Sequence, residues 1–62
     1  MRFKKGDRVQ HRIDSHAGTI TDLRERGVAG CAVTYLEWVE VTYDNGMITK
    51  GVPNSFKLVG DE

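Results

Sequence analysis

The side chains best suited to chemistry in this chain include an aspartate, a serine and a histidine that follow one another directly. Asp14, Ser15 and His16 are the residue types of an orienting carboxylate, a nucleophile and a base. Catalysis needs such groups to converge in space, whereas consecutive loop residues form local turn hydrogen bonds. No phosphate-binding loop or other catalytic motif accompanies them. We therefore predict that the protein is not an enzyme.

Two histidines and one cysteine are the candidate metal ligands. The spacing of His11, His16 and Cys31 fits no zinc pattern. His11 alternates with Val9 and Ile13, which predicts a hydrogen-bonded, half-buried imidazole. Cys31 has no cationic neighbour in sequence that would activate a thiol, so a packing role is expected. We predict no metal and no cofactor.

Length and composition limit the fold to one small domain. Sixty-two residues, 39% hydrophobic and 29% charged, indicate a single globular domain over residues 1–62 with a minimal core. A lone cysteine cannot form an internal disulfide, which favours a reducing compartment. The chain has no signal peptide pattern and no run of about 18 apolar residues. We expect a cytoplasmic protein without a membrane segment.

The net charge is zero, but the charges are unevenly distributed. The first twelve residues hold five basic side chains and one acidic side chain. A basic segment attracts a phosphate backbone, although a surface of solvated charges is the simpler explanation. Lys4, Lys5, Arg8 and Arg12 are the predicted contacts to RNA or DNA.

Residues 38–46 are the clearest structural signal. β-Branched and aromatic residues alternate with polar ones and end at Asn45-Gly46, which predicts a strand entering a type I′ hairpin turn. This strand is expected to span residues 35–43. Further strands are expected at residues 8–13, 19–23, 47–50 and 57–59. Residues 22–27 are expected to form a widened hairpin loop or one helical turn, residues 27–34 a mobile loop, and residues 53–56 a 3₁₀-like turn. The period-two pattern assigns Val9, Ile13, Ile20, Val39, Val41, Tyr43, Ile48, Phe56 and Leu58 to the core.

The register of residues 35–43 leaves large apolar side chains outside. If Val39 and Val41 face inward, Leu36 and Trp38 face outward. A bulge near Glu37 would turn one of them inward. Otherwise Tyr35, Leu36 and Trp38, with the loop at residues 27–34, form a surface for a protein partner or for self-association.

The order of these signals resembles the SH3-like small barrel, in the pattern shared by KOW and Tudor-like domains. The matching segments are Lys5-Gly6-Asp7-Arg8-Val9, Gly18-Thr19-Ile20, Val39 to Gly46, Val52-Pro53 and Phe56-Lys57-Leu58-Val59. The resemblance implies an all-β barrel of about five bent antiparallel strands, with a long loop before the central strand. KOW-type domains bind RNA or nucleoprotein partners, for which Tyr35 or Trp38 would be a stacking platform. Tudor-like domains bind methylated side chains, for which Tyr35, Trp38, Tyr43 and Phe56 with Asp44 would be the cage.

The entry Gly6-Asp7-Arg8-Val9 is also similar to that of the plasmid-type dihydrofolate reductase barrel. That family builds its pore from a Val-Gln-Ile-Tyr run, and the matching segment here is Ile48-Thr49-Lys50-Gly51. The glutamine and the tyrosine have no counterpart, so the activity is not carried over. The leading expectation is a non-enzymatic module that contacts nucleic acid or a nucleoprotein through its first strand. The alternative is a protein-interaction or self-assembling module.

Overall fold

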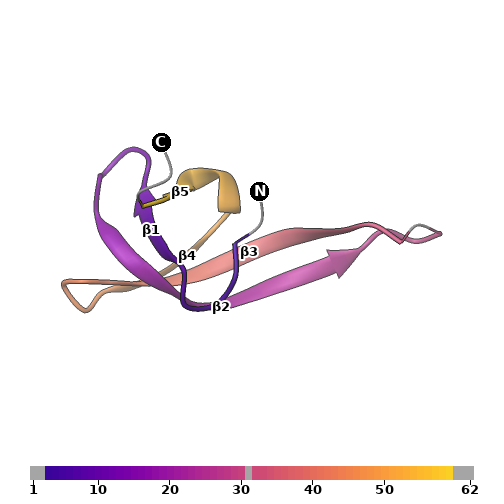
Figure 1. The fold of residues 1–62 in the computed structure, drawn as a ribbon, viewed down its shortest axis with the longest axis horizontal. Coiled ribbons are helices and arrows are strands. Elements are labelled where there is room, and N and C mark those ends of the chain that lie inside the picture. The colour runs from indigo at the N-terminus through magenta and orange to yellow at the C-terminus, as the bar shows by residue number, and fades with distance from the viewer. Residues whose placement is uncertain (1–2, 31, 60–62) are drawn as a thin grey trace.

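The computed structural model describes residues 3–30 and 32–59 and shows an all-β fold. Five antiparallel strands form one sheet in the order β4-β3-β2-β1-β5 (Figure 1). The strands are β1 (Arg8–His11), β2 (Ala17–Gly27), β3 (Thr34–Tyr43), β4 (Ile48–Gly51) and β5 (Phe56–Leu58). A 3₁₀ turn, η1 (Pro53–Ser55), joins β4 to β5, where the proline predicted it. Cys31 and the acidic residues Asp61 and Glu62 lie outside the described residues.

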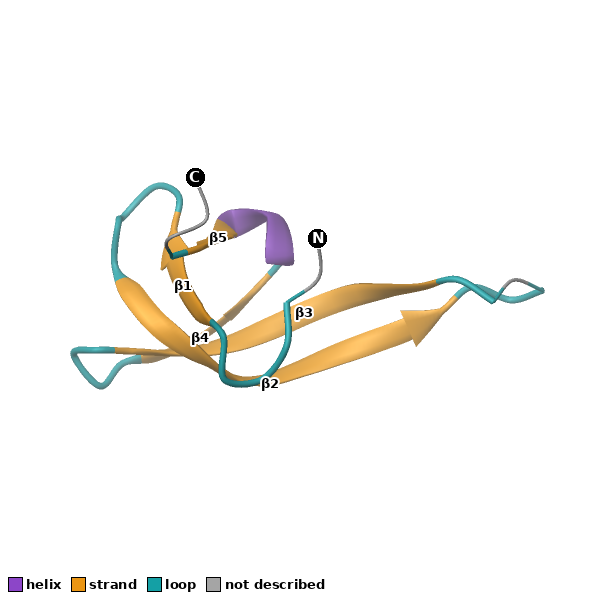
Figure 2. Cartoon of the chain, in the orientation of Figure 1, coloured by secondary structure: helices purple, strands orange, loops and turns teal. Residues whose placement is uncertain are grey.

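The sheet curls like an SH3-like small barrel but does not close. The meander from β2 to β4 is followed by η1, and β5 then returns to pair with β1 (Figure 2). Val59 N–H donates to the Arg8 carbonyl at 3.0 Å, which continues that pairing past β5. Within residues 3–30 and 32–59 no pairing joins β4 to β5, so the closure that the resemblance implies is not complete. No helix in that part of the chain is long or apolar enough to cross a membrane.

Five side chains form the core, and all of them were expected there. Val9, Ile20, Val39, Val41 and Phe56 are at most 2% exposed and come from β1, β2, β3 and β5. The partly buried side chains that pack against them are Phe3, Leu23, Leu36, Tyr43 and Leu58. The alternation of apolar residues therefore identified the centre of the domain correctly.

Two residues assigned to the core lie outside it. Ile13 is 84% exposed because β1 ends at His11, and the chain turns away before the alternation reaches residue 13. Ile48 is 64% exposed because it lies opposite Thr42, on the outer face of the sheet. Thr49, opposite the buried Val41, takes the inward position instead.

The prediction for residues 22–27 was wrong, because they form the second half of β2. This strand runs alongside β3 as far as Gly27 opposite Thr34, which leaves residues 28–30 and 32–33 as the described part of the loop between the strands. Beyond the other strands the two continue as a two-stranded extension, which we call the arm (residues 22–30 and 32–38; Figure 1). The arm gives the molecule an elongated shape of 41 × 24 × 19 Å.

The hairpin between β3 and β4 is present, but its turn is not of type I′. Gly46 has a φ of 92°, whereas Asn45 does not have a positive φ. Gly46 N–H donates to the Tyr43 carbonyl at 2.9 Å, and Tyr43 N–H donates to the Met47 carbonyl at 2.7 Å. This pattern is that of a three-residue loop ending in a left-handed glycine. Asn45 contributes through its side chain, whose Oδ1 accepts from Met47 N–H at 3.0 Å.

A candidate binding surface on the arm

Two bulges shape the pairing of β2 with β3, one in each strand. Ile20 lies opposite Val41 and Asp22 opposite Glu40, so Thr21 is an extra residue in β2. Arg24 lies opposite Trp38 and Glu25 opposite Leu36, so Glu37 is an extra residue in β3. A bulge increases the local twist and changes which side chains share a face. Of the two alternatives for residues 36–38, the structure therefore contains the one with a bulge at Glu37.

The Glu37 bulge places Tyr35 and Trp38 on the same face of the arm. Arg24 and Arg26 are two residues apart in β2, so they share a face, and Trp38 and Tyr35 lie opposite them. We call this the convex face. Leu36 points to the other side and packs against the core. Of the three predicted partner-binding residues, the structure thus brings Tyr35 and Trp38 together and separates Leu36 from them.

Glu37 lies between two arginines of the convex face. Its Oε2 accepts a hydrogen bond from Arg26 Nε at 3.1 Å and forms an ion pair with Arg24 Nε, also at 3.1 Å. The hydrogen bond and the charge of Glu37 raise the pKa of Arg26 further above its ordinary value. Both guanidinium groups use Nε for this contact, and within residues 3–30 and 32–59 their terminal nitrogens make no hydrogen bond. Those nitrogens remain available to an anionic ligand.

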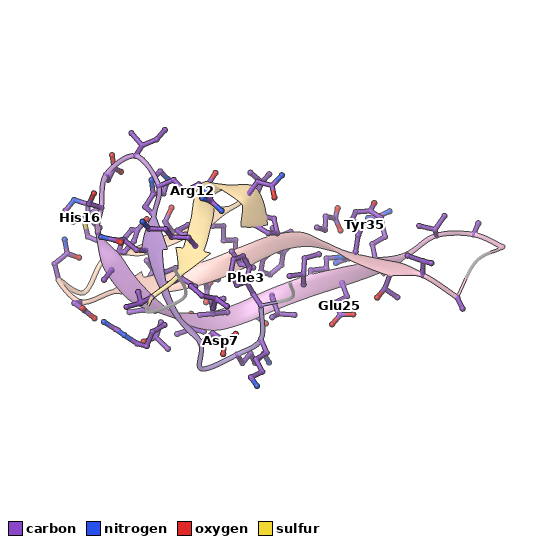
Figure 3. All side chains as sticks on the ribbon, turned by 45° about the horizontal axis from the view of Figure 1, so that its top comes forward. Phe3, Asp7, Arg12, His16, Glu25 and Tyr35 are labelled. Carbon is purple, nitrogen blue, oxygen red and sulfur yellow. The ribbon has the colours of Figure 1, made fainter. Side chains whose placement is uncertain are left out.

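Lys50 adds a third cation to the convex face. Its ammonium lies 4.4 Å from the centroid of the Trp38 ring, which is a cation–π contact. Lys50 comes from β4, opposite Glu40 of β3. Tyr35 is the more open aromatic platform, because its side chain is 48% exposed (Figure 3).

The four basic residues predicted to contact nucleic acid are dispersed over several parts of the fold. Arg8 forms a two-pronged ion pair with Asp44, with both N–O distances at 2.8 Å, and also donates to Thr19. Lys5 lies 3.7 Å from the Asp22 carboxylate. Arg12 Nε donates to the Asn54 carbonyl at 2.9 Å. Lys4 lies in the exposed segment before β1, and its backbone N–H donates to Asp7.

The Arg8–Asp44 pair predicts a specific response to acid. The hydrogen bond from Arg8 holds the pKa of the Asp44 carboxyl below its ordinary value. A depressed folded-state pKa contributes stability above the unfolded-state pKa, and that contribution is lost as pH falls through the folded-state value. Arg8→Gln should therefore raise the pKa of Asp44 toward its ordinary value, as measured by carboxyl NMR titration. Lys5→Gln, which leaves the Arg8 contact intact, should not shift it, and an unchanged Asp44 titration in Arg8→Gln would contradict the assignment.

His11, Asp14, Ser15 and His16 belong to the turn between β1 and β2. His11 Nδ1 accepts from Ile13 N–H at 3.1 Å and from Asp14 N–H at 3.3 Å, so the hydrogen of a neutral imidazole lies on Nε2. Ser15 has a φ of 62° and donates its backbone N–H to the His11 carbonyl. These contacts are those of a local turn, and the hydroxyl of Ser15 is not directed to a base by any of them.

The same turn borders a hollow of about 500 Å³ beside Tyr43. The His16 and Tyr43 rings lie 5.7 Å apart, and the His11 ring meets Phe56 edge-on at 5.2 Å. Burial, and secondarily the charge of Asp14, raise the pKa of Tyr43. Within the part of the chain that the structure describes, no three potential metal ligands converge here or elsewhere.

The four aromatic residues and the aspartate considered for a Tudor-like cage do not converge. Phe56 is buried, and Tyr43 contacts His16 at the end of the sheet opposite the arm. Tyr35 and Trp38 lie on the convex face, and Asp44 is bound to Arg8.

Comparison with models of known protein families, with characterised proteins and with solved structures finds no match to this chain.

The sequence did not indicate Arg24, Arg26 or Lys50 as members of a site. Arg24 and Arg26 fell in a segment expected to be a loop, where two arginines separated by one residue share no defined face. Their alternation with Glu25 was the available signal, since residues two apart in a strand point to the same side. Lys50 was assigned to a strand, but its approach to Trp38 depends on the β3–β4 register, which sets Lys50 opposite Glu40, two residues from Trp38.

Proposed function

We propose that this protein is a non-enzymatic binding module that holds single-stranded nucleic acid on the convex face of its arm. The observation that carries the proposal is the Glu37 bulge, which sets Tyr35 and Trp38 on one face with Arg24 and Arg26. Aromatic rings interleaved with cations are the combination that binds single strands without a sequence code. We also propose, as expected from the sequence, that the protein is cytoplasmic and uses no cofactor.

Each side chain has a distinct role in this proposal. The exposed ring of Tyr35 stacks on a base, because every base offers a π-face. The terminal nitrogens of Arg24 and Arg26 contact phosphate oxygens while Glu37 holds their Nε atoms. Lys50 lies over Trp38, so this indole positions a cation in addition to offering its own surface.

The charges on the convex face predict moderate affinity. Arg24, Arg26 and Lys50 are partly offset by Glu37 and Glu40, and the whole chain is neutral. Three phosphate contacts correspond to a salt slope of about −2, from roughly −0.7 for each contact to a single strand. The first strand adds little to this face, because Arg8 is neutralised by Asp44.

The test is the binding of a fluorescently labelled oligo(dT) or oligo(U) of about twelve nucleotides, followed by anisotropy in low salt. Tyr35→Ala should weaken binding about 5- to 150-fold, because stacking contributes about 1–3 kcal/mol for each base. Arg26→Gln should weaken it and make the salt slope shallower by about 0.7.

The matched control is Arg12→Gln, which removes a cation predicted from the sequence that lies beside Leu36, on the side of the molecule away from the convex face. Binding should be unchanged in this variant. Absence of any binding at low salt would refute the proposal, and a loss in Arg12→Gln with none in Arg26→Gln would move the site to the first strand. The alternative expectation, a protein-interaction or self-assembling module, concerns a different surface of the arm.

A further inference from the structure

One edge of the arm lies open beside the end of β4. The pairing of β4 with β3 stops at Gly51 opposite Val39, and Pro53 then turns the chain into η1. Residues 35–38 of β3 therefore have β2 on one side and, among residues 3–30 and 32–59, no strand on the other (Figure 2). We call residues 35–38 the open edge.

The hydrogen-bonding groups of Leu36 point outward from this edge. In an antiparallel ladder, alternate residues direct their N–H and C=O groups to opposite sides. Val28 N–H donates to the Val33 carbonyl at 3.1 Å, which identifies the residues of the arm that bond across its two strands. Counting along the register from this pair, Arg26 and Tyr35 bond to each other, whereas Leu36 directs its groups away from β2. An additional strand would therefore find a donor and an acceptor at Leu36.

A groove of about 620 Å³ begins where the open edge meets the body of the domain. Its apolar lining comes from the segment before β1, from the arm, and from the chain after β4. These residues are Phe3, Leu36, Val52, Pro53, Phe56 and Leu58. Val52 is 58% exposed, which is unusual for an apolar residue next to a core phenylalanine. The groove is suited to a small apolar side chain.

The far end of the arm offers such side chains. Val33 is 63% exposed and Val28 is 44% exposed, and the two valines are joined by the hydrogen bond between their backbones. Neither packs against the core of its own chain. The arm therefore has an apolar end and, at its base, an apolar groove that its own end cannot reach.

We propose that a second copy of this chain pairs with the open edge. The two arms lie antiparallel around a two-fold axis at Leu36, so that Leu36 of each copy exchanges both backbone hydrogen bonds with Leu36 of the other. Thr34 then lies opposite Trp38, and the next residue, Val33, would meet position 39, which Gly51 already occupies. The end of each arm consequently turns into the groove of the other copy, with Val33 beside Val52.

The charges of the two edges favour this pairing over the alternatives. Glu37 is the one charged residue of the open edge, and the two-fold register sets it opposite the neutral Tyr35. The other edge of the arm carries Asp22, Arg24, Glu25 and Arg26. A two-fold register centred on Glu25 would set Glu25 against its own copy and Arg24 against Arg26, which is repulsive. A second copy therefore meets no like charge at the open edge, and Leu36 meets Leu36.

Such a dimer is independent of the nucleic-acid proposal but compatible with it. A two-fold axis perpendicular to the sheet keeps the two convex faces on the same side, so each dimer presents Tyr35 and its arginines twice. A domain of this length buries a small core, and pairing of the arms adds buried apolar surface.

The test compares the wild type with Val33→Asp by sedimentation equilibrium over a range of concentrations, without nucleic acid. The wild type should dimerise, and Val33→Asp should raise the dimer dissociation constant at least about tenfold, because both grooves lose an apolar side chain and receive a charge. The matched control is Ile13→Asp, at an exposed apolar residue in the turn between β1 and β2, outside the arm. It should dimerise as the wild type does.

Hydrogen exchange of the Leu36 amide provides a second measurement that needs no variant. This amide should exchange quickly in dilute protein and become protected as the concentration rises, whereas the amide of the buried Val41 should remain protected throughout. A monomer at every concentration would overturn the proposal. Dimerisation with an unprotected Leu36 amide, or with equal dissociation constants for Val33→Asp and Ile13→Asp, would also overturn it.

Discussion

Gly18→Ala should leave the chain largely unfolded at 25 °C. A Cβ at this position would lie 2.5 Å from the Thr42 carbonyl oxygen and 2.8 Å from the Tyr43 Cα. Both atoms belong to the backbone of the neighbouring strand, so no side chain can rotate to make room. The strands β2 and β3 would have to separate where Gly18 pairs with Tyr43, near the buried Val41. Circular dichroism and urea titration should show a loss of most of the stability, which is about 3–5 kcal/mol for a core of this size.

Gly27→Ala is the matched control for this prediction. Gly27 lies in the same strand, but a Cβ there would meet no atom within 4 Å, and its φ is not positive. This substitution should change the free energy of unfolding by no more than about 0.5 kcal/mol, as expected for an exposed site. Equal destabilisation by the two substitutions would show that β2 and β3 do not approach each other as closely as the structure indicates.

Phe56→Ala should have an effect of similar size through a different mechanism. Phe56 is 2% exposed, and its ring contacts His11 edge-on and lies 3.5 Å from the position of a Cβ built on Gly51. Truncating a buried phenylalanine costs about 3–5 kcal/mol, because transfer energy is lost and a cavity remains. Since this matches the whole expected stability, the variant should be unfolded or close to its midpoint in water. The measurement is thermal and urea unfolding followed by circular dichroism.

The control for Phe56→Ala is Ile13→Ala. Ile13 belonged to the same alternating pattern in the sequence, yet it is 84% exposed. Its truncation should change the free energy of unfolding by less than about 0.5 kcal/mol. Comparable losses at residues 13 and 56 would restore the sequence-based assignment of Ile13 to the core and contradict the end of β1 at His11.

The body of the domain could be predicted because its strands have one buried face. Val9, Val39 and Val41 alternate with polar residues, so the sequence records which side faces the core. The assignment of Ile13 to the core was wrong because the apolar alternation continues in the sequence past His11, where the strand ends. The assignment of Ile48 to the core was wrong because the face of the sheet to which it points depends on its pairing with Thr42. The turn at Gly46 sets that register.

The β3 half of the arm lies largely in the strand predicted at residues 35–43, but the β2 half could not be predicted, because residues 24–27 are exposed. Residues 22–27 are mostly charged, and a strand that buries neither face leaves no alternation of apolar residues. What supports the strand here is its hydrogen bonding to β3, together with long-range contacts such as the one between Arg26 and Glu37. Sequence spacing also cannot show that Arg8 is paired with Asp44, 36 positions away.

Only part of the candidate site could be predicted, because its geometry depends on which residues lie opposite each other in β2 and β3. The conflict between Leu36 and Trp38 pointed to a bulge at Glu37, which the structure contains. It did not indicate that the bulge would bring Tyr35 to the side of Trp38, because that result depends on which cross-strand residues lie opposite.

The bulge in β2 and the bulge in β3 have opposite effects on the register, and they cancel each other. Thr21 adds one residue to β2 and Glu37 adds one residue to β3, so Glu25 and Leu36 follow the same alignment as Ile20 and Val41 on the near side of both bulges. Removing either extra residue alone would displace the distal half of one strand by a single position and reverse the orientation of its side chains. A single-residue insertion or deletion in β2 or β3 is therefore tolerated only when the other strand carries a compensating one.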